Sequence, residues 1–266
     1  MGHGSGIREV AWVDIPGGGQ VVLDGDHAYV GHMQPPQGTS VIDVKDPANP
    51  KVVASIDIPP GLHSHKVRVA NDIMVVNRER TRGDKPAGDF VGLRIFDVSR
   101  PGNPRDICHW ECAGSGVHRF TFDGRYAYIS TEQEGYVGTI VMILDLKDPT
   151  RPEEVGRWWM EGQWIAGGET PSWKAKNHRC HHPIRRGDRL YVSYWYGGGV
   201  ILDISDMTKP KLISSLDWSH RSAGRRTAWF RSMYRSPAIA GCWSPTSTCS
   251  LWIPSSRPSC RRRSGW

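Results

Sequence analysis

Short stretches in which hydrophobic and polar residues alternate recur along the chain and predict β-hairpins. In residues 118–129, HRFTFDGRYAYI, two phenylalanines alternate with polar residues, Asp123-Gly124 turns the chain, and an aromatic run returns. Residues 140–146, IVMILDL, follow as a third strand, and the Lys-Asp-Pro turn at 147–149 ends it. This pattern predicts one small antiparallel sheet.

The same unit recurs three more times. Its hairpins lie at 24–30, 71–76 and 187–192, and each third strand carries a marker aspartate: Asp43, Asp97, Asp145 and Asp203. The marker aspartates are 54, 48 and 58 residues apart, an interval that suits propeller blades and is too long for most helical repeats. The sequence therefore predicts an all-β fold, a β-propeller with four recognisable blades.

The pattern also divides the chain into segments. We expect an N-terminal segment at 1–19 with a strand at 9–13, then blades at about 20–61, 62–116, 117–164 and 165–219. Residues 220–266 are rich in Arg, Ser and Trp and lose the alternation, so they lack the pattern of a blade. Two interpretations stay open for this tail: an aberrant, frameshifted segment that leaves a truncated ring, or a genuine basic extension.

The net charge of +7 comes from the tail rather than from the blades. Residues 221–266 hold nine Arg and no Asp, Glu or Lys, which leaves 25 basic and 27 acidic side chains in residues 1–220. Near-neutral blades give no reason to expect nucleic acid as a partner. Since no stretch approaches the ~18 apolar residues of a membrane span, we expect a soluble protein. It would be cytoplasmic if the N-terminus is complete and periplasmic or extracellular if a leader is missing, and its oligomeric state stays open.

Three cysteines lie in the blades and three in the tail, without the spacing of a zinc site. No disulfide is implied, although a bond between Cys108 and Cys112 stays open. Cys180 stands beside His181, where it would be either a ligand for a soft metal or, as we favour, a buried inert thiol.

Histidines occupy equivalent positions in three of the four units. His65, His118 and His181 each lie six residues before their hairpin turn, and the same offset lands on Gly19 in the first unit. Equivalent positions on the innermost strands of a propeller lie at equal depth around its axis, so these imidazoles should converge. The predicted metal ligands are His65, His118 and His181, with His63 and His182 assisting.

Imidazole suits several transition metals, and three histidines with an open position form a catalytic pattern. The competing interpretation is that each histidine hydrogen-bonds a neighbouring blade or lines a wet channel. Four acidic residues could orient imidazoles or act as a fourth ligand, although solvated or structural roles are favoured: Glu79, Glu132, Glu134 and Glu169. The marker aspartates should bond the turn backbone and are not expected to be catalytic.

The marker strands resemble the LVIVD-repeat family, whose namesake motif is matched by VIDV at 41–44, IFDV at 95–98, ILDL at 143–146 and ILDI at 201–204. That family is taken to form β-propellers, and most members have no assigned activity. More distantly, the arrangement is similar to the selenium-binding protein and methanethiol oxidase family, propellers thought to hold copper on axial histidines. The resemblance implies copper as the metal, with zinc or iron as alternatives. It covers about residues 20–219, and nothing after His220 matches the later blades of that family.

Three functions follow from these patterns. The first is a metal-dependent oxidoreductase that acts on a small molecule at the propeller axis. The second is a non-catalytic propeller that serves as a scaffold or binding module. The third is a nonfunctional truncated product, which the tail suggests.

Overall fold

The computed structural model describes residues 8–81, 90–173 and 176–217. Blade one contains β1 (Gly18–Asp24), β2 (His27–His32), β3 (Gln37–Asp43) and β4 (Lys51–Asp57). Blade two contains β5 (Leu62–His63), β6 (Val67–Ala70), β7 (Ile73–Arg80), β8 (Gly92–Asp97) and β9 (Arg105–Glu111). Blade three contains β10 (Ala113–Phe122), β11 (Tyr126–Glu132), β12 (Thr139–Asp145) and β13 (Glu153–Trp158). After the short 3-10 helix η1 (Ile165–Gly167), blade four contains β14 (Arg179–Arg186), β15 (Arg189–Trp195), β16 (Gly198–Asp203) and β17 (Lys211–Leu216).

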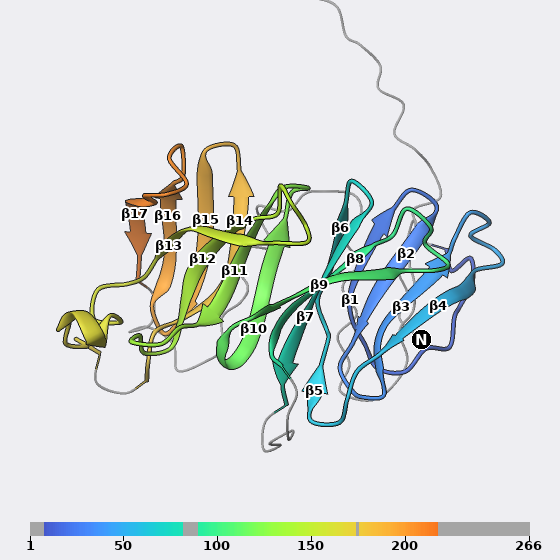
Figure 1. Cartoon of the computed structure of the whole chain (residues 1–266), viewed down its shortest axis with the longest axis horizontal. Helices are drawn as coiled ribbons and strands as arrows, with labels where there is room; N and C mark the ends of the chain where they lie inside the picture. Colours follow the sequence, from blue (N-terminus) through green and yellow to red (C-terminus); the bar gives the residue numbers. More distant parts are fainter. Residues whose placement is uncertain (1–7, 82–89, 174–175, 218–266) are drawn as a thin grey trace, which may run out of the picture.

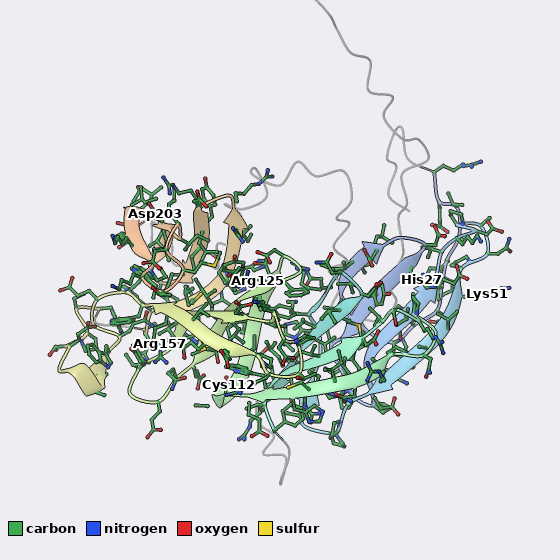
Figure 2. The ribbon with its side chains drawn as sticks, turned by 45° about the horizontal axis from the view of Figure 1, so that its top comes forward. His27, Lys51, Cys112, Arg125, Arg157 and Asp203 are labelled. Atoms are coloured by element: carbon green, nitrogen blue, oxygen red, sulfur yellow. The ribbon has the colours of Figure 1, made fainter. Side chains whose placement is uncertain are left out.

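The blades are antiparallel meanders that lie side by side in an arc (Figure 1). Their first long strands, β1, β6, β10 and β14, contact one another in that order and form the inner side of the arc. The last strands, β4, β9, β13 and β17, contain only exposed and half-buried residues, as outermost strands should. Figure 2 shows Lys51 of blade one and Asp203 of blade four at opposite ends of this arc. The prediction of an all-β propeller with four blades is confirmed.

The hydrophobic cores lie between the blades, because alternate residues of each middle strand face opposite neighbours. In β2, Tyr29 packs toward Met74 and Val76 of blade two, whereas Ala28 and Val30 face the other side of blade one. The cores between later blades are built in the same way, with Phe120 and Ile129 in the one and Tyr128 in the other. Period-two alternation is therefore what joins one blade to the next.

The predicted strand at 9–13 is wrong. Residues 8–15 form no strand, because their backbone has no neighbouring strand to pair with among the described residues. Val13 and Ile15 instead pack their side chains on the outer face of blade one. Burial of apolar side chains thus holds this segment without a hydrogen-bonded ladder.

The marker aspartates close the turn that ends each third strand, as predicted. Asp43, Asp97, Asp145 and Asp203 each accept a hydrogen bond from the backbone N–H two residues later, at 2.8–2.9 Å. This is the hydrogen bond of an Asx-turn, in which the side chain replaces a backbone acceptor. The repeated aspartate is therefore a structural device of every blade.

The prediction for the tail at 220–266 falls outside the described residues. Within the described ranges, no helix has the length and apolar character needed to cross a membrane. Cys108, Cys112 and Cys180 are free thiols.

Candidate metal centre

A β-bulge occurs in the inner strand of each blade, at the position where the sequence repeats its histidine. In β10 the extra residue is His118, and in β14 it is His181, because the residues on either side of each pair with consecutive residues of the next strand. Between β5 and β6, three residues that include His65 face two residues of β7, and β1 shifts its register across Gly19. Bulges re-aim a side chain out of the regular alternation. The shared six-residue offset in the sequence thus has a physical counterpart.

The close approach of blades one and two explains why the first unit carries glycine where the others carry histidine. Gln20 N–H donates to the carbonyl of His65 at 2.9 Å. A Cβ built on Gly19 would lie 2.6 Å from that carbonyl oxygen, and one on Gly31 would lie 2.5 Å from the carbonyl oxygen of Ser64. Neither position has room for a side chain, so His65 takes the space that a fourth histidine would need.

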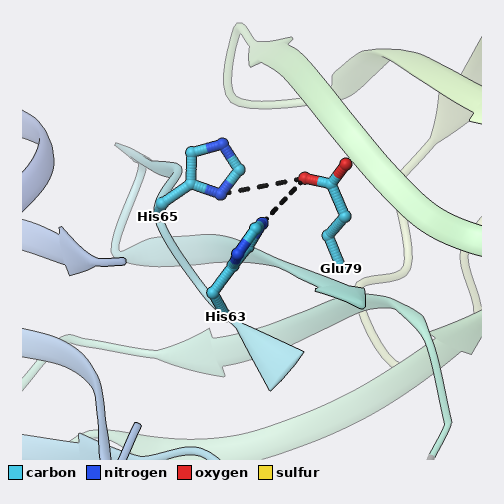
Figure 3. A group of neighbouring side chains, drawn as sticks. All are labelled: His63, His65 and Glu79. Atoms are coloured by element: carbon cyan, nitrogen blue, oxygen red, sulfur yellow. Dashed lines mark hydrogen bonds and ion pairs between the residues drawn. The ribbon is translucent and has the colours of Figure 1, made fainter. Parts of the chain in front are cut away.

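Glu79 lies at the centre of the histidines and is held by strands on both sides. Its backbone pairs with His63 of β5 and with Gly116 of β10, where blades two and three are joined in one sheet. His63 Nε2 lies 3.0 Å from Glu79 Oε2, and His118 Nδ1 lies 2.8 Å from Oε1 and 3.1 Å from Oε2. His65 Nδ1 lies 3.8 Å from Oε2 (Figure 3). Residues His63, His65, Glu79, His118 and His181 are called the axial cluster below.

The carboxylate of Glu79 is ionised in this setting. Its side chain is 11% exposed, and burial alone would raise its pKa. The hydrogen bonds from His118 and His63 outweigh burial and lower the pKa to about 2. One buried negative charge therefore faces three imidazoles.

The protonation state of His65 follows from its neighbour Asn77. The Asn77 amide is oriented by two backbone groups, since its Oδ1 accepts from Lys66 N–H at 2.8 Å and its Nδ2 donates to the Val117 carbonyl at 2.9 Å. The same Nδ2 lies 3.4 Å from His65 Nδ1, which must then present a lone pair. That lone pair also faces Glu79 Oε2, so two acceptors stand 3.8 Å apart. A cation between them would relieve this repulsion.

Donor atoms of His63, His65 and Glu79 all lie within 4.8 Å of one another. Metal bonds of about 2.0–2.2 Å place neighbouring donors of a tetrahedral ion about 3.4 Å apart. The distances from Glu79 Oε2 to the two histidines, 3.0 and 3.8 Å, bracket that spacing. These three residues could therefore hold a metal ion.

His118 and His181 continue the cluster toward blade four. His118 Nδ1 donates to Glu79, and its buried Nε2 has no hydrogen-bond partner among the described residues. The His118 and His181 rings are 5.2 Å apart, and His181 stacks on Trp195 at 5.0 Å. His182 lies further away, with its ring 6.5 Å from that of His181.

Burial, helped by nearby positive charges, keeps His65, His181 and His182 neutral. Burial lowers the pKa of His65 well below its usual value, and the charges of Lys66 and Arg119 add to this effect. For His181, burial and then the Arg119 charge lower the pKa to about 2. Burial acts on His182 in the same direction. Neutral imidazoles are the form in which histidine binds metal.

The remaining acidic candidates have structural roles. Glu169 accepts from Trp159 Nε1 and from two backbone N–H groups of its own loop, and Glu132 bonds Ser115 and Arg179. Glu134 is exposed. Cys180 is buried in the core between blades three and four, where burial raises the pKa of its thiol, as expected for an inert thiol.

Sequence reasoning did not single out Asn77, Lys66, Arg119 or Trp195. Lys66 and Arg119 directly follow two of the repeated histidines, which is the one signal that could have found them. Asn77 and Trp195 come from neighbouring strands, so their approach depends on the fold.

Comparison with known families matches the LVIVD repeat to residues 18–58 and 186–217, which span blade one and most of blade four. The chain carries LVIVD repeats. In this LVIVD-repeat chain the two middle blades fall outside the matched residues, yet they form the same meander with the same Asx-turn.

Relatives of the LVIVD-repeat chain are distant. An uncharacterized protein of Archaeoglobus fulgidus is 27% identical over 126 residues, which are 44% of this chain and 19% of that protein. A solved structure from Lactobacillus plantarum matches with a TM-score of 0.56 at 15% identity, over 75% of this chain and 57% of the other. A hypothetical selenium-binding protein from Sulfolobus tokodaii matches with a TM-score of 0.51 at 15% identity, over 77% and 51%. The chain spans about a fifth of the curated relative and about half of these structures, whose likeness shows the fold.

Proposed function

We propose that the axial cluster binds one transition-metal ion through His63 Nε2, His65 Nδ1 and the Glu79 carboxylate. The observation that carries this proposal is the lone pair of His65 Nδ1 facing the ionised carboxylate. A bound ion would take this lone pair in place of the long, 3.4 Å contact with Asn77 Nδ2. A metal ion would replace the proton of the His63–Glu79 hydrogen bond. It would also bind His65 Nδ1 and Glu79 Oε2, the two acceptors that face one another.

The donor set indicates which metals to test first. Two imidazoles and one carboxylate are the ligands of catalytic zinc sites and of non-haem iron(II) oxygenases. The set predicted from sequence, His65, His118 and His181 with His63 or His182 assisting, contained only nitrogen, and the family resemblance implied copper. With Glu79 included, zinc and iron(II) become better candidates than copper.

His118 would support the metal without being a ligand in this arrangement. Its Nδ1–H holds the carboxylate, and such outer partners orient ligands and tune affinity. Its Nε2 has no hydrogen-bond partner among the described residues, and its ring lies 5.2 Å from that of His181, so a small molecule bound between the two rings could contact it. When bound, the metal would supply Lewis acidity or, for iron, a redox centre.

Three protein donors leave coordination positions for a small molecule, so we propose a metal-dependent enzyme rather than a structural site. The set supports this role because structural zinc sites usually close all four positions with protein ligands. A pure scaffold would gain little from a buried carboxylate surrounded by neutral imidazoles, since burying charge is costly.

Metal stoichiometry in the full chain tests the proposal. The purified protein is stripped of metal, loaded separately with zinc, iron(II) without oxygen, or copper(II), desalted, and measured by elemental analysis. We expect about one zinc or iron ion per chain, retained in His109→Ala and lost in Glu79→Gln and His63→Ala. His109 is a matched control because it lies on the outer strand β9 and bonds Asp106 at 3.1 Å.

The variants also separate the two ligand sets. His118→Ala should weaken binding about 10–100-fold, as outer partners do. If His118→Ala and His181→Ala abolish binding while His63→Ala retains it, the all-histidine set is the correct one. Equal metal content in Glu79→Gln and His109→Ala would refute the site.

A further inference from the structure

Buried Lys66 and half-buried Arg119 lie beside the axial cluster, and their side-chain donors have few partners among the described residues. Lys66 is 6% exposed, and the contact of its Nζ is a 3.4 Å hydrogen bond to the carbonyl of the preceding residue, His65. An ammonium group has three N–H donors, so most of its capacity is unused by the described residues.

Arg119 is the second cation, and it follows the bulge residue His118 on β10. Its Nε is buried and has no hydrogen-bond partner among the described residues. Lys66 and Arg119 directly follow His65 and His118, whose ring centroids lie 5.9 Å apart. The Asn77 side chain bonds both Lys66 N–H and the Val117 carbonyl, so the two cations come from neighbouring stretches of backbone.

The carboxylate whose charge acts on both cations is Glu79, and it is already hydrogen-bonded to His63 and His118. Burial lowers the pKa of Lys66 well below its usual value, so the ammonium group lacks a partner that would hold its charge. Buried donors are normally hydrogen-bonded, so the unused donors of Lys66 and Arg119 indicate a missing acceptor.

We propose that Lys66 and Arg119 form a subsite for the oxyanion group of a small molecule, such as a carboxylate or sulfate. A planar guanidinium and an ammonium group are the donors that bind such groups in proteins. The inference deepens the proposed function by naming the substrate class, because an anion held there would lie next to the metal. Binding of the anion itself does not require the metal ion.

Anion binding to the metal-free chain tests the subsite separately from the metal. Calorimetric titration with sodium sulfate and with sodium acetate, at an ionic strength kept constant with chloride, gives the dissociation constants. Acetamide has the size of acetate without its charge and should not bind. We expect saturable binding of sulfate or acetate to one site, and the two arms show which oxyanion the subsite prefers.

Five variants assign the site to the two cations. Lys66→Met and Arg119→Gln should each raise the dissociation constant at least tenfold, whereas Lys66→Arg should restore most of the affinity. Lys51→Met and Arg151→Gln change exposed cations at the blade surface and should bind as the unaltered chain does. Unfolding curves confirm that each variant folds.

Each outcome decides one proposal. Equal affinities in Lys66→Met and Lys51→Met, or heat that follows ionic strength alone, would overturn the anion subsite. Sulfate binding that depends on Lys66, in a chain that takes up no zinc or iron, would support the subsite and refute the metal centre. Stoichiometric metal uptake without anion binding would support the metal centre and refute the anion subsite.

Discussion

Replacement of Glu79 by Gln removes the charge at the centre of the axial cluster while keeping the size of the side chain. The folded protein lowers the pKa of Glu79 from 4.5 to about 2. At 1.36 kcal/mol per pKa unit, the ionised carboxylate contributes about 3 kcal/mol at neutral pH relative to its protonated form. Its side chain is 11% exposed, so solvent screens little of this energy. Gln resembles the protonated acid, and the metal-free variant should lose about 3 kcal/mol of unfolding free energy at pH 7.

The pH dependence of this loss follows from the direction of the shift. A depressed carboxyl pKa stabilises the fold above the unfolded value, near 4.5, and this stabilisation disappears as pH falls toward 2. The difference between the unaltered chain and Glu79→Gln should therefore be constant from pH 7 to about 5 and shrink below 4.5.

Urea denaturation of the two metal-free proteins across this range measures the difference directly. Glu134→Gln serves as the matched control because Glu134 is exposed, and surface substitutions usually stay within about 0.5 kcal/mol. A loss at pH 7 no larger in Glu79→Gln than in Glu134→Gln would refute the reasoning, since the histidines would then not be holding an ionised carboxylate.

Three further predictions concern other parts of the fold. The metal-free protein should lose stability as pH falls below about 6.5, because the fold lowers the pKa of His181 to about 2 and the unfolded chain binds the proton first. Urea midpoints measured against pH should show this loss, and His181→Gln should flatten their dependence on pH. Gly31→Ala should cost roughly 1–3 kcal/mol because its Cβ would lie 2.5 Å from a backbone oxygen of blade two. Gly102→Ala should not cost this much, because its Cβ would meet nothing closer than 3.9 Å. Equal melting temperatures of the Gly31→Ala and Gly102→Ala variants would contradict the close approach of blades one and two. Asp145→Ala should cost roughly 1–2 kcal/mol by removing the acceptor for Lys147 N–H; a change in metal content as well would show that the turn is not purely structural.

Much of the fold was predictable because it depends on local pattern. The outer strand at 211–216 and the aspartate turns follow from alternation and from side-chain hydrogen bonds within a few residues. The six-residue offset aligned His118 and His181, and the structure shows that both are bulge residues, which the sequence had not predicted. Residues 9–13 contain an apolar run that suits a strand, but a strand also needs a partner, which the local sequence does not report.

The centre of the candidate site was not predictable in the same way. Glu79 was one of four acidic candidates, and nothing in its sequence neighbourhood distinguished it. It becomes central because β7 pairs with β5 on one side and meets Gly116 of blade three on the other. The lone pair of His65 depends on Asn77, whose orientation is set by backbone groups of two blades. Long-range contacts of this kind have no periodic signal.

An anomalous difference map from crystals of the zinc-loaded full chain tests the central claim most directly, because it locates the ion among the candidate ligands. The account predicts one peak at about 2.0–2.2 Å from His63 Nε2, His65 Nδ1 and the Glu79 carboxylate. A peak bonded to His118 Nε2 and His181, with Glu79 beyond bonding distance, would contradict it, and so would an axial cluster without a peak.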